Sequence, residues 1–492
     1  MRRYFTFLTL CIFLSGCLLG PNYRPPENAV PDEWNAECAP LCPPEASPPI
    51  AWWELFSDPY LNTYIERAAL YNNDILNAEA NILQARAMRQ VTASALFPQV
   101  SADLNATRTY FSKNGPVFAI QNGGGANMVT GLPFQIQIPQ IQNLYNALID
   151  VSWEIDLFGK TRRAIEAACD QIGGAIASRN DVLISVLAEV ARNYMELRSA
   201  QRQGQLIEEN IDLLEKTQYI SEKRLQAGYI NRLDFDRVDA ELAQARASLP
   251  DVLAQIYQNI YALSVLTGAL PETLLSELLP IEPLPSVPRT ACVGLRSDLL
   301  RRRPDVRVAE RRLAAATANI GVAVASFFPT FTLLGDIGFQ SLKLSNLFQA
   351  RSVTWAIGGD VNVPLFTGGR LTGNLHLAEA QAISAAFTYQ QTVLRALQEA
   401  ETALIAYTNE LQTADDLSFA VEKYESLVAL TRTRNAKGLV SITDVLDIER
   451  QWITSAQNLL SSETAALVDL ITLYKALGGG WEPVDGACIA LP

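Results

Sequence analysis

The stretch Asp74-Ile75-Leu76-Asn77-Ala78-Glu79 returns 231 residues later as Asp305-Val306-Arg307-Val308-Ala309-Glu310, with Asp, Ala and Glu kept. Phe97-Pro98 returns at the same offset as Phe328-Pro329. A second set recurs at an offset of 210 residues, where the later copies of Gly228, Asp234 and Gly268 are Gly438, Asp444 and Gly478. Internal duplication of long helical units predicts an architecture of repeated elements, a tube rather than a globule.

The helices of each repeat are predicted to differ in length. Apolar residues follow a helical spacing over 58–96, and Pro98 ends that helix. The intervals 159–228 and 369–438 are each 69 residues, so an unbroken helix there would run about 100 Å. The spans 231–268 and 299–327 are shorter, and end to end they match one long helix. This pattern predicts a long helical barrel wall, with long helices flanked by stacked pairs of half-length ones.

Four segments alternate apolar and polar side chains, which predicts strands near 98–110, 145–157, 329–341 and 352–366. Carboxylates stay off the apolar face in all four segments, and each segment has the length of a tilted membrane-spanning strand. A soluble sandwich edge with one wet face is the alternative. Four strands cannot close a barrel, so a spanning sheet has to be shared, and three chains giving twelve strands is the simplest closure.

The first residues have the pattern of an export signal. Arg2 and Arg3 precede the short apolar stretch Tyr4–Leu14, and Leu14-Ser15-Gly16-Cys17 resembles a bacterial lipobox. Lipidation of Cys17 would place the protein in the cell envelope, held at a membrane surface. The alternative is an ordinary cleaved signal followed by a chance cysteine.

The domain organisation follows from these elements. We expect a signal peptide over 1–16, a lipidated Pro-rich tether over 17–57, a first repeat over 58–270 and a second repeat over 299–477. A Pro-rich linker over 271–298 and a C-terminal segment over 478–492 would form a belt around the middle of the tube.

Charge and composition exclude several classes of function. The formal net charge is −13 and the chain has no basic cluster, which argues against nucleic acid as a partner. The run Arg301–Arg303 is predicted to be a solvated helix entry. Gly123-Gly124-Gly125 is predicted to be a flexible loop, because no strand-then-helix context supports a phosphate site.

Cysteine and histidine usage argues against a metal site or an enzyme. Cys38 and Cys42 could close a small disulfide loop, and Cys292 and Cys488 could pair across the repeats, with free thiols as the alternative in each case. The single histidine, His376, is expected on the surface. Zinc is disfavoured, no cofactor is indicated, and no catalytic set can be assembled around that histidine.

Several motifs together resemble those of the TolC-like outer membrane efflux factors, in their lipoprotein (OprM/NodT-like) branch. They are the lipobox followed by Gly20-Pro21-Asn22-Tyr23-Arg24-Pro25-Pro26, Trp52-Trp53 with Phe56 and Asp58, Arg303-Pro304-Asp305 with Ala309-Glu310, Leu365-Phe366 with Gly368-Gly369, and Ala476-Leu477-Gly478-Gly479-Gly480-Trp481. The resemblance implies a homotrimer, mainly α-helical, with a transmembrane twelve-stranded β-barrel on a twelve-helix periplasmic α-barrel. It also implies a passive exit duct without a catalytic site, anchored in the outer membrane of a Gram-negative-type bacterium. Its partners would be a periplasmic adaptor protein and an inner membrane transporter, and its cargo small molecules such as drugs.

The same resemblance implies a gate. Asp444 and Asp447 match two aspartate rings at the closed periplasmic entrance, and Asp234 occupies the equivalent position in the first repeat. Acids in the first turn of a helix also favour the positive end of its dipole, which is the simpler explanation. The arginine and tyrosine that some relatives use to hold the gate shut fall here at Val440 and Asn435, and a substitute would come from Arg432, Arg434 or Lys437.

Adaptor contacts are expected at the two repeat-equivalent turns, at Gly228, Tyr229, Ile230, Asn231, Gly438, Leu439, Val440 and Ser441. A rival function is a lipid-anchored periplasmic coiled-coil adaptor or structural lipoprotein without a pore. The four alternating strands favour the duct, because an adaptor would need no uncharged face rich in Trp and Ile.

Overall fold

The computed structural model describes residues 18–26, 31, 34, 48–115 and 139–482. The chain forms two compact units, which do not coincide with the two repeats. Unit 1 comprises 1–24, 86–170 and 314–384, and unit 2 comprises 25–85, 171–313 and 385–492. Each unit therefore draws on both repeats. The predicted Gly123–Gly125 loop, Cys17, Cys38, Cys42 and Cys488 lie outside the described residues.

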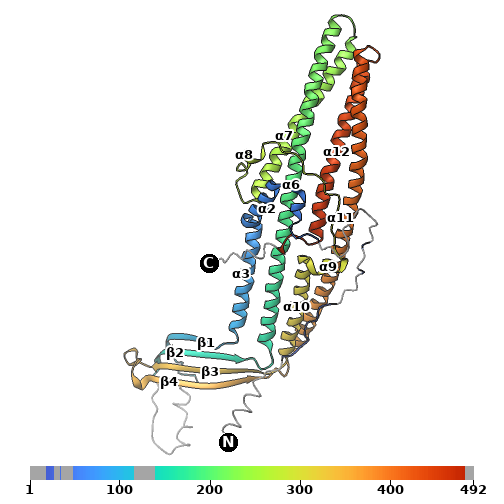
Figure 1. The fold of residues 1–492 in the computed structure, drawn as a ribbon. Coiled ribbons are helices and arrows are strands. Elements are labelled where there is room, and N and C mark those ends of the chain that lie inside the picture. The colour runs from blue at the N-terminus through green and yellow to red at the C-terminus, as the bar shows by residue number, and fades with distance from the viewer. Residues whose placement is uncertain (1–17, 27–30, 32–33, 35–47, 116–138, 483–492) are drawn as a thin grey trace, which may run out of the picture. The chain divides into compact units, whose positions relative to one another are not determined.

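Unit 1 contains one antiparallel sheet in the order β1-β2-β3-β4 (Figure 1). Its strands are β1 (Gln99–Tyr110), β2 (Ile141–Ile155), β3 (Thr330–Ser341) and β4 (Val353–Asn362). Strand β2 starts earlier than expected, because Ile141 pairs with Tyr110 at the far end of β1. Strand β4 ends before the expected 366, where Pro364 has no backbone N–H to offer a ladder.

The register places the strand carboxylates on one face. Asp150 lies opposite Ser101 on one side and Asp336 on the other, and Thr332 lies between Glu154 and Asp360. Because directly paired residues share a face, the prediction of a carboxylate-free face is confirmed. Large apolar side chains on that face are exposed, namely Val100, Leu104, Ile149, Leu333, Ile337, Trp355, Ile357 and Val361. Such an area of exposed apolar surface requires an apolar environment or a partner.

The helices of unit 2 break where the sequence predicted continuity. The helix expected over 58–96 is two helices, α2 (Pro59–Tyr71) and α3 (Asn73–Ser94). Asn72 caps the second, since its Oδ1 accepts hydrogen bonds from the N–H groups of Asp74 (2.8 Å) and Ile75 (3.3 Å). Its Nδ2 donates to the Leu266 carbonyl at 2.9 Å. The second repeat breaks at the equivalent residue, Arg303, between α9 (Arg296–Arg302) and α10 (Pro304–Ala325).

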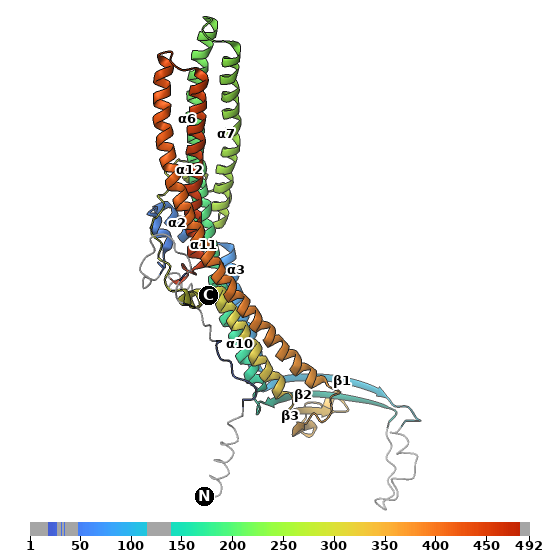
Figure 2. The same ribbon diagram turned by 90° about the vertical axis from the view of Figure 1, so that its right-hand side faces the viewer.

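The long helices have nearly the predicted length. Helices α6 (Lys160–Gln226) and α11 (Arg370–Ala436) are 67 residues each, and α7 (Arg232–Leu266) and α12 (Ile442–Ala476) are 35 each. Figure 2 shows α7 beside α6 and α12 beside α11 as two helical hairpins. Short elements complete the described chain, namely η1 (Trp52–Phe56), α8 (Leu275–Leu278), η2 (Leu344–Asn346) and η3 (Ala350–Ser352). None of the described helices combines the length and apolarity needed to cross a membrane.

The main core of unit 2 lies where elements of both repeats meet. Trp52 is 1% exposed and stacks on Tyr474 of α12, with ring centroids 6.2 Å apart. Asp58 caps α2 through Oδ1 and accepts a hydrogen bond from the buried Tyr194 hydroxyl of α6 at 2.7 Å through Oδ2. The buried core around these contacts contains Leu187 and Ile260 of the first repeat together with Leu404 and Leu470 of the second, so the duplicated halves share one core.

Two glycines of the sheet allow a matched test of its packing. A Cβ at Gly338 in β3 would lie 2.1 Å from the Ala147 carbonyl oxygen of β2, whereas a Cβ at Gly358 in β4 would meet nothing within 4 Å. We expect Gly338→Ala to destabilise the sheet by about 2 kcal/mol through overpacking. We expect Gly358→Ala to change stability little. Thermal unfolding of the detergent-solubilised variants measures both, and equal effects would show that the β2–β3 contact does not constrain the sheet.

Candidate functional site

The turn between α11 and α12 is built from local hydrogen bonds. Gly438 adopts a φ of +73°, and the next N–H, of Leu439, donates to the Arg434 carbonyl at 3.0 Å. This closes α11 with the left-handed glycine turn that helix C-termini favour. Ser441 then starts α12 with a capping box, in which its Oγ accepts from Asp444 N–H at 3.1 Å and its N–H donates to Asp444 Oδ2 at 2.9 Å.

Both predicted gate acids of the second repeat are exposed on the first turns of α12. Spacing of three residues puts Asp444 and Asp447 on one side of the helix. Asp447 accepts from Arg450 at 3.4 Å, and Arg450 also lies 3.8 Å from Glu241 of α7. Asp444 and Asp447 are thus exposed on α12, and Arg450 beside them also contacts the first hairpin.

Asp234 occupies the matching turn of the first repeat. Its N–H donates to the Asn231 side-chain oxygen at 2.8 Å, so α7 begins with the same kind of cap. The residue equivalent to Asp447 is Arg237, so the first repeat has no acidic pair there. Among the described contacts, none joins Asp234 to Asp444 or Asp447. The structure therefore brings together two of the three predicted gate residues.

Contacts near the turn that the sequence did not predict stabilise the second hairpin. Glu449 of α12 is 5% exposed, and its Oε1 accepts from Arg432 Nε of α11 at 2.7 Å. Asn435 Nδ2 donates to the Val440 carbonyl at 2.9 Å. Arg432, one of the candidates for a gate link, is therefore engaged within its own hairpin. The sequence signal for this ion pair was the opposite charge of Arg432 before the turn and Glu449 after it, 17 residues apart.

The turn residues named as adaptor contacts are largely exposed. Tyr229 is 83% exposed and Leu439 is 68% exposed, at equivalent positions of the two turns. Large apolar side chains at the tip of a helical hairpin are unusual for a solvated surface and are typical of contact sites. A Cβ added at Gly228 or Gly438 would meet nothing within 4 Å, so the glycines are needed for their positive φ and not for space.

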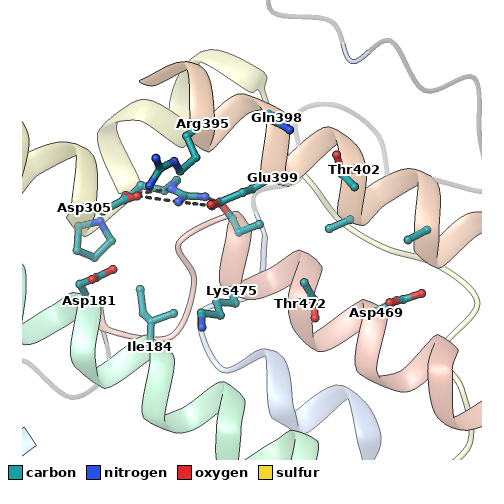
Figure 3. Close-up of a pocket in the computed structure, with 15 residues that line it drawn as sticks. Asp181, Ile184, Asp305, Arg395, Gln398, Glu399, Thr402, Asp469, Thr472 and Lys475 are labelled. Carbon is teal, nitrogen blue, oxygen red and sulfur yellow. Dashed lines mark hydrogen bonds and ion pairs between the residues drawn. The ribbon is translucent and has the colours of Figure 1, made fainter. Parts of the chain in front are cut away.

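A groove of about 710 Å³ lies in unit 2 among α6, the start of α10, α11 and the end of α12 (Figure 3). Its central ion pairs are made by Arg303, which is 7% exposed. The guanidinium donates to Asp305 (3.0 and 2.7 Å), Glu399 (2.6 Å) and the Ala476 carbonyl (2.9 Å). The prediction that the Arg301–Arg303 run is solvated is wrong for Arg303, because the helix break turns this side chain inward.

The groove also perturbs an acid on α6. Asp181 is exposed at the edge of the groove, but the protein atoms around its carboxylate partly desolvate it, and this raises its pKa above the ordinary value. The charge of Asp305 raises the pKa further, while Arg303 and Lys475 oppose the shift. Figure 3 shows Asp181 and Lys475 facing the same space. The described residues contain no group of three or more His, Cys, Asp or Glu side chains arranged for a metal ion.

Other predicted residues have clear positions. His376 is exposed on α11, as expected. Cys292 is disulfide-bonded, and Cys169 is an exposed free thiol. The pairing of Cys292 with Cys488 stays a prediction.

The model of the family described as outer membrane efflux protein matches residues 64–269 and 295–479. The chain belongs to this outer membrane efflux family. It is 30% identical to the probable efflux pump outer membrane protein SepC of Pseudomonas putida, over 99% of this chain and 98% of the relative. It is 27% identical to nodulation protein T of Rhizobium leguminosarum bv. viciae, over 96% of this chain and 92% of the relative.

Among solved structures, the outer-membrane channel OprN superposes with a TM-score of 0.84 at 29% identity, covering 95% of this chain and all of that one. The family assignment confirms the expected fold class, a long helical region joined to a sheet. It also confirms the expected function and location: this efflux family member is an exit duct in the outer membrane.

The buried Arg303 allows a test of the network in the groove. We expect Arg303→Ala to lower the free energy of unfolding by about 3 kcal/mol, because two carboxylates and a carbonyl lose their partner in a confined site. Arg301→Ala, at an exposed position two residues earlier, should cost little. Chemical unfolding in detergent compares the two variants, and equal losses would show that the network does not hold these helices together.

Asp181 gives a pH prediction. Its raised pKa means that the folded state binds the proton more tightly than the unfolded state. Stability from this group is therefore present below the ordinary value of 3.8 and is lost as pH rises through the folded pKa. Asp181→Asn should raise the unfolding temperature relative to the parent at neutral pH, and this gain should shrink toward about pH 4.

Asp415 provides the opposite case. Its hydrogen bond to Arg289 lowers its pKa below the ordinary value of 3.8. Asp415 therefore contributes stability at pH values above 3.8, and this contribution is lost as the pH falls through the folded pKa. Asp415→Asn should therefore lower the unfolding temperature at neutral pH. Shifts of the same sign in both variants would contradict this account of the two sites.

Proposed function

We propose that three copies of this chain form a gated duct through which a tripartite pump exports small molecules such as drugs. Cys17 would carry the lipid anchor in the outer membrane. The helical hairpins would extend into the periplasm and meet a periplasmic adaptor protein, and through it an inner membrane transporter. Membership of an efflux family supports this role.

The observation that carries the proposal is the sheet of unit 1. Its outer strands β1 and β4 have no strand partner on their far sides in the described chain. Unpaired strand edges beside an exposed apolar face are unfavourable in water and in lipid, since each free N–H and C=O needs a partner. Edge-to-edge pairing of three copies would satisfy both edges in a ring of twelve strands, with the carboxylate face inward and the apolar face toward lipid.

The proposed gate uses the turn between α11 and α12. Asp444 and Asp447 from three copies would place six carboxylates around the periplasmic entrance. Like charges concentrated in a narrow mouth attract cations and bind multivalent ones most strongly. The capping box does not exclude this role, because the Asp444 carboxylate remains exposed while Oδ2 accepts from Ser441.

Planar-bilayer conductance tests the duct and its gate together. The purified protein should form channels that Mg²⁺ blocks from the periplasmic side. Asp444→Ala with Asp447→Ala should raise the half-blocking Mg²⁺ concentration about ten-fold, a loss of about 1.4 kcal/mol in binding. Asp416→Ala, which removes an exposed acid of α11 away from the turn, is the matched control. Unchanged block in the double variant would move the cation site elsewhere, and absence of channels would refute the duct.

Site-specific photo-cross-linking tests the adaptor contact. A photoreactive residue at Tyr229 or Leu439 should give adducts with the adaptor in cells that express the whole pump. The same residue at Leu344 in η2, which is 63% exposed beside the sheet, should give none. Adducts only at Leu344 would place the adaptor at the strand loops and contradict the proposed contact.

A further inference from the structure

A buried arginine of unit 1 binds the residues that directly follow Cys17. We name Leu18–Arg24 the post-cysteine segment. Arg163, in the first turn of α6, is 1% exposed. Its Nε donates to the Leu19 carbonyl at 2.9 Å, and its Nη2 donates to the Gly20 carbonyl at 3.2 Å and to Asn22 Oδ1 at 2.7 Å. Its Nη1 donates to Glu166 Oε2 at 2.7 Å.

Two glycines let the post-cysteine segment close over this arginine. Gly20 has a φ of +90°, and a Cβ built there would lie 2.4 Å from the Gly321 Cα of α10. A Cβ on Gly321 would in turn lie 2.9 Å from the Arg163 side chain. The segment, α10 and the arginine therefore contact one another with no room for a methyl group. Only glycine fits at both positions without displacing them.

This contact lies where the strands of unit 1 give way to helices. The Leu19 N–H points to the Phe158 carbonyl at 3.4 Å, in the short connection between β2 and α6. Phe158 packs on Phe328, two residues before β3, with ring centroids 4.9 Å apart. The segment is thus bound at the helix-side end of the sheet.

Arg163 can stay buried only while the post-cysteine segment is bound to it. A buried guanidinium is tolerated only when its donors are paired, and losing partners leaves an uncompensated charge. Here the post-cysteine segment supplies three of the four acceptors of Arg163. The folded end of α6 and α10 therefore requires the segment to be in place, and the position of the segment is fixed by the fold.

We propose that Arg163, Gly20 and Gly321 form an anchor site that holds the lipid-bearing cysteine at the helix-side end of the sheet. The inference rests on the proposed lipidation of Cys17. The Leu19 backbone is bound through its carbonyl and its N–H, and Cys17 precedes it by two residues. Consecutive Cα atoms are about 3.8 Å apart, so the bound Leu19 restricts the cysteine to within about 8 Å of it. The acyl chains and the apolar face of the sheet then meet the bilayer at one level, and anchoring raises the local concentration of the strands there.

A double-mutant cycle tests this proposal. Gly321→Ala inserts a methyl group into the anchor site, whereas Gly373→Ala makes the same change in α11, where a Cβ meets nothing within 4 Å. Each is made with Cys17 intact and with Cys17→Ser. The readouts are palmitate incorporation, hydrogen exchange of the post-cysteine segment, and the rate at which pulse-labelled protein enters the outer membrane as an oligomer.

We expect Gly321→Ala to keep the palmitate label, to increase exchange of the post-cysteine segment and to slow membrane entry about five-fold with Cys17 intact. In the Cys17→Ser background it should slow entry little further, because there is no anchor to position. Gly373→Ala should change neither the hydrogen exchange of the post-cysteine segment nor the rate of membrane entry. If Gly321→Ala does not accumulate, Asn22→Ala, which removes one acceptor of Arg163, replaces it in the cycle.

Equal slowing by Gly321→Ala in both backgrounds would overturn the proposal, since the site would then act only through stability. Unchanged exchange of the segment in Gly321→Ala would also overturn it. If the parent protein incorporates no palmitate, the lipidation part of the proposed function fails and the anchor role with it. Channels in planar bilayers would still support the duct in that case.

Discussion

The buried guanidinium of Arg303 is the contact on which unit 2 depends. It joins the start of α10 to α11 through Glu399 and to the last turn of α12 through the Ala476 carbonyl. A Cβ on Gly478, just past α12, would lie 3.1 Å from Arg303, so the chain leaves that helix directly against the arginine. The Trp52–Tyr474 stack packs beside the same helix end. Arg303 therefore joins the end of α12 to the start of α10, two of the half-length helices.

The sheet imposes a different constraint, because it is incomplete in one chain. Cross-strand pairing satisfies the inner backbone groups, and the alternation of side chains separates carboxylates from apolar residues. Its edges and apolar face are left for other molecules to cover. The helical hairpins end in exposed turns, and both turns present acidic and apolar side chains. The functional parts of the molecule are thus the surfaces that its own fold does not cover.

Local patterns predicted the parts of the fold that local forces determine. The strand faces, the long helices and the turn glycines Gly228 and Gly438 follow from periodicity and positive φ. The break at Asn72 and the burial of Arg303 were missed, because each depends on a partner far away in sequence: Leu266 is 194 residues from Asn72, and Ala476 is 173 residues from Arg303. Asn72 and Arg303 are related by the repeat offset of 231 residues, although one is an asparagine and the other an arginine. Similarly, the lipobox marks Cys17, but only the fold shows that Arg163 binds the residues after it, 141 to 144 positions away.

The mass of the detergent-solubilised particle tests the central claim, that the incomplete sheet is closed by further copies of the chain. Three chains of 54.0 kDa give 162 kDa, and slightly less once a signal peptide is removed. Light scattering that separates protein from detergent should give a protein mass near this value. A stable particle of one chain, soluble in buffer without detergent, would contradict the account, because its sheet edges and apolar face would then need no partner.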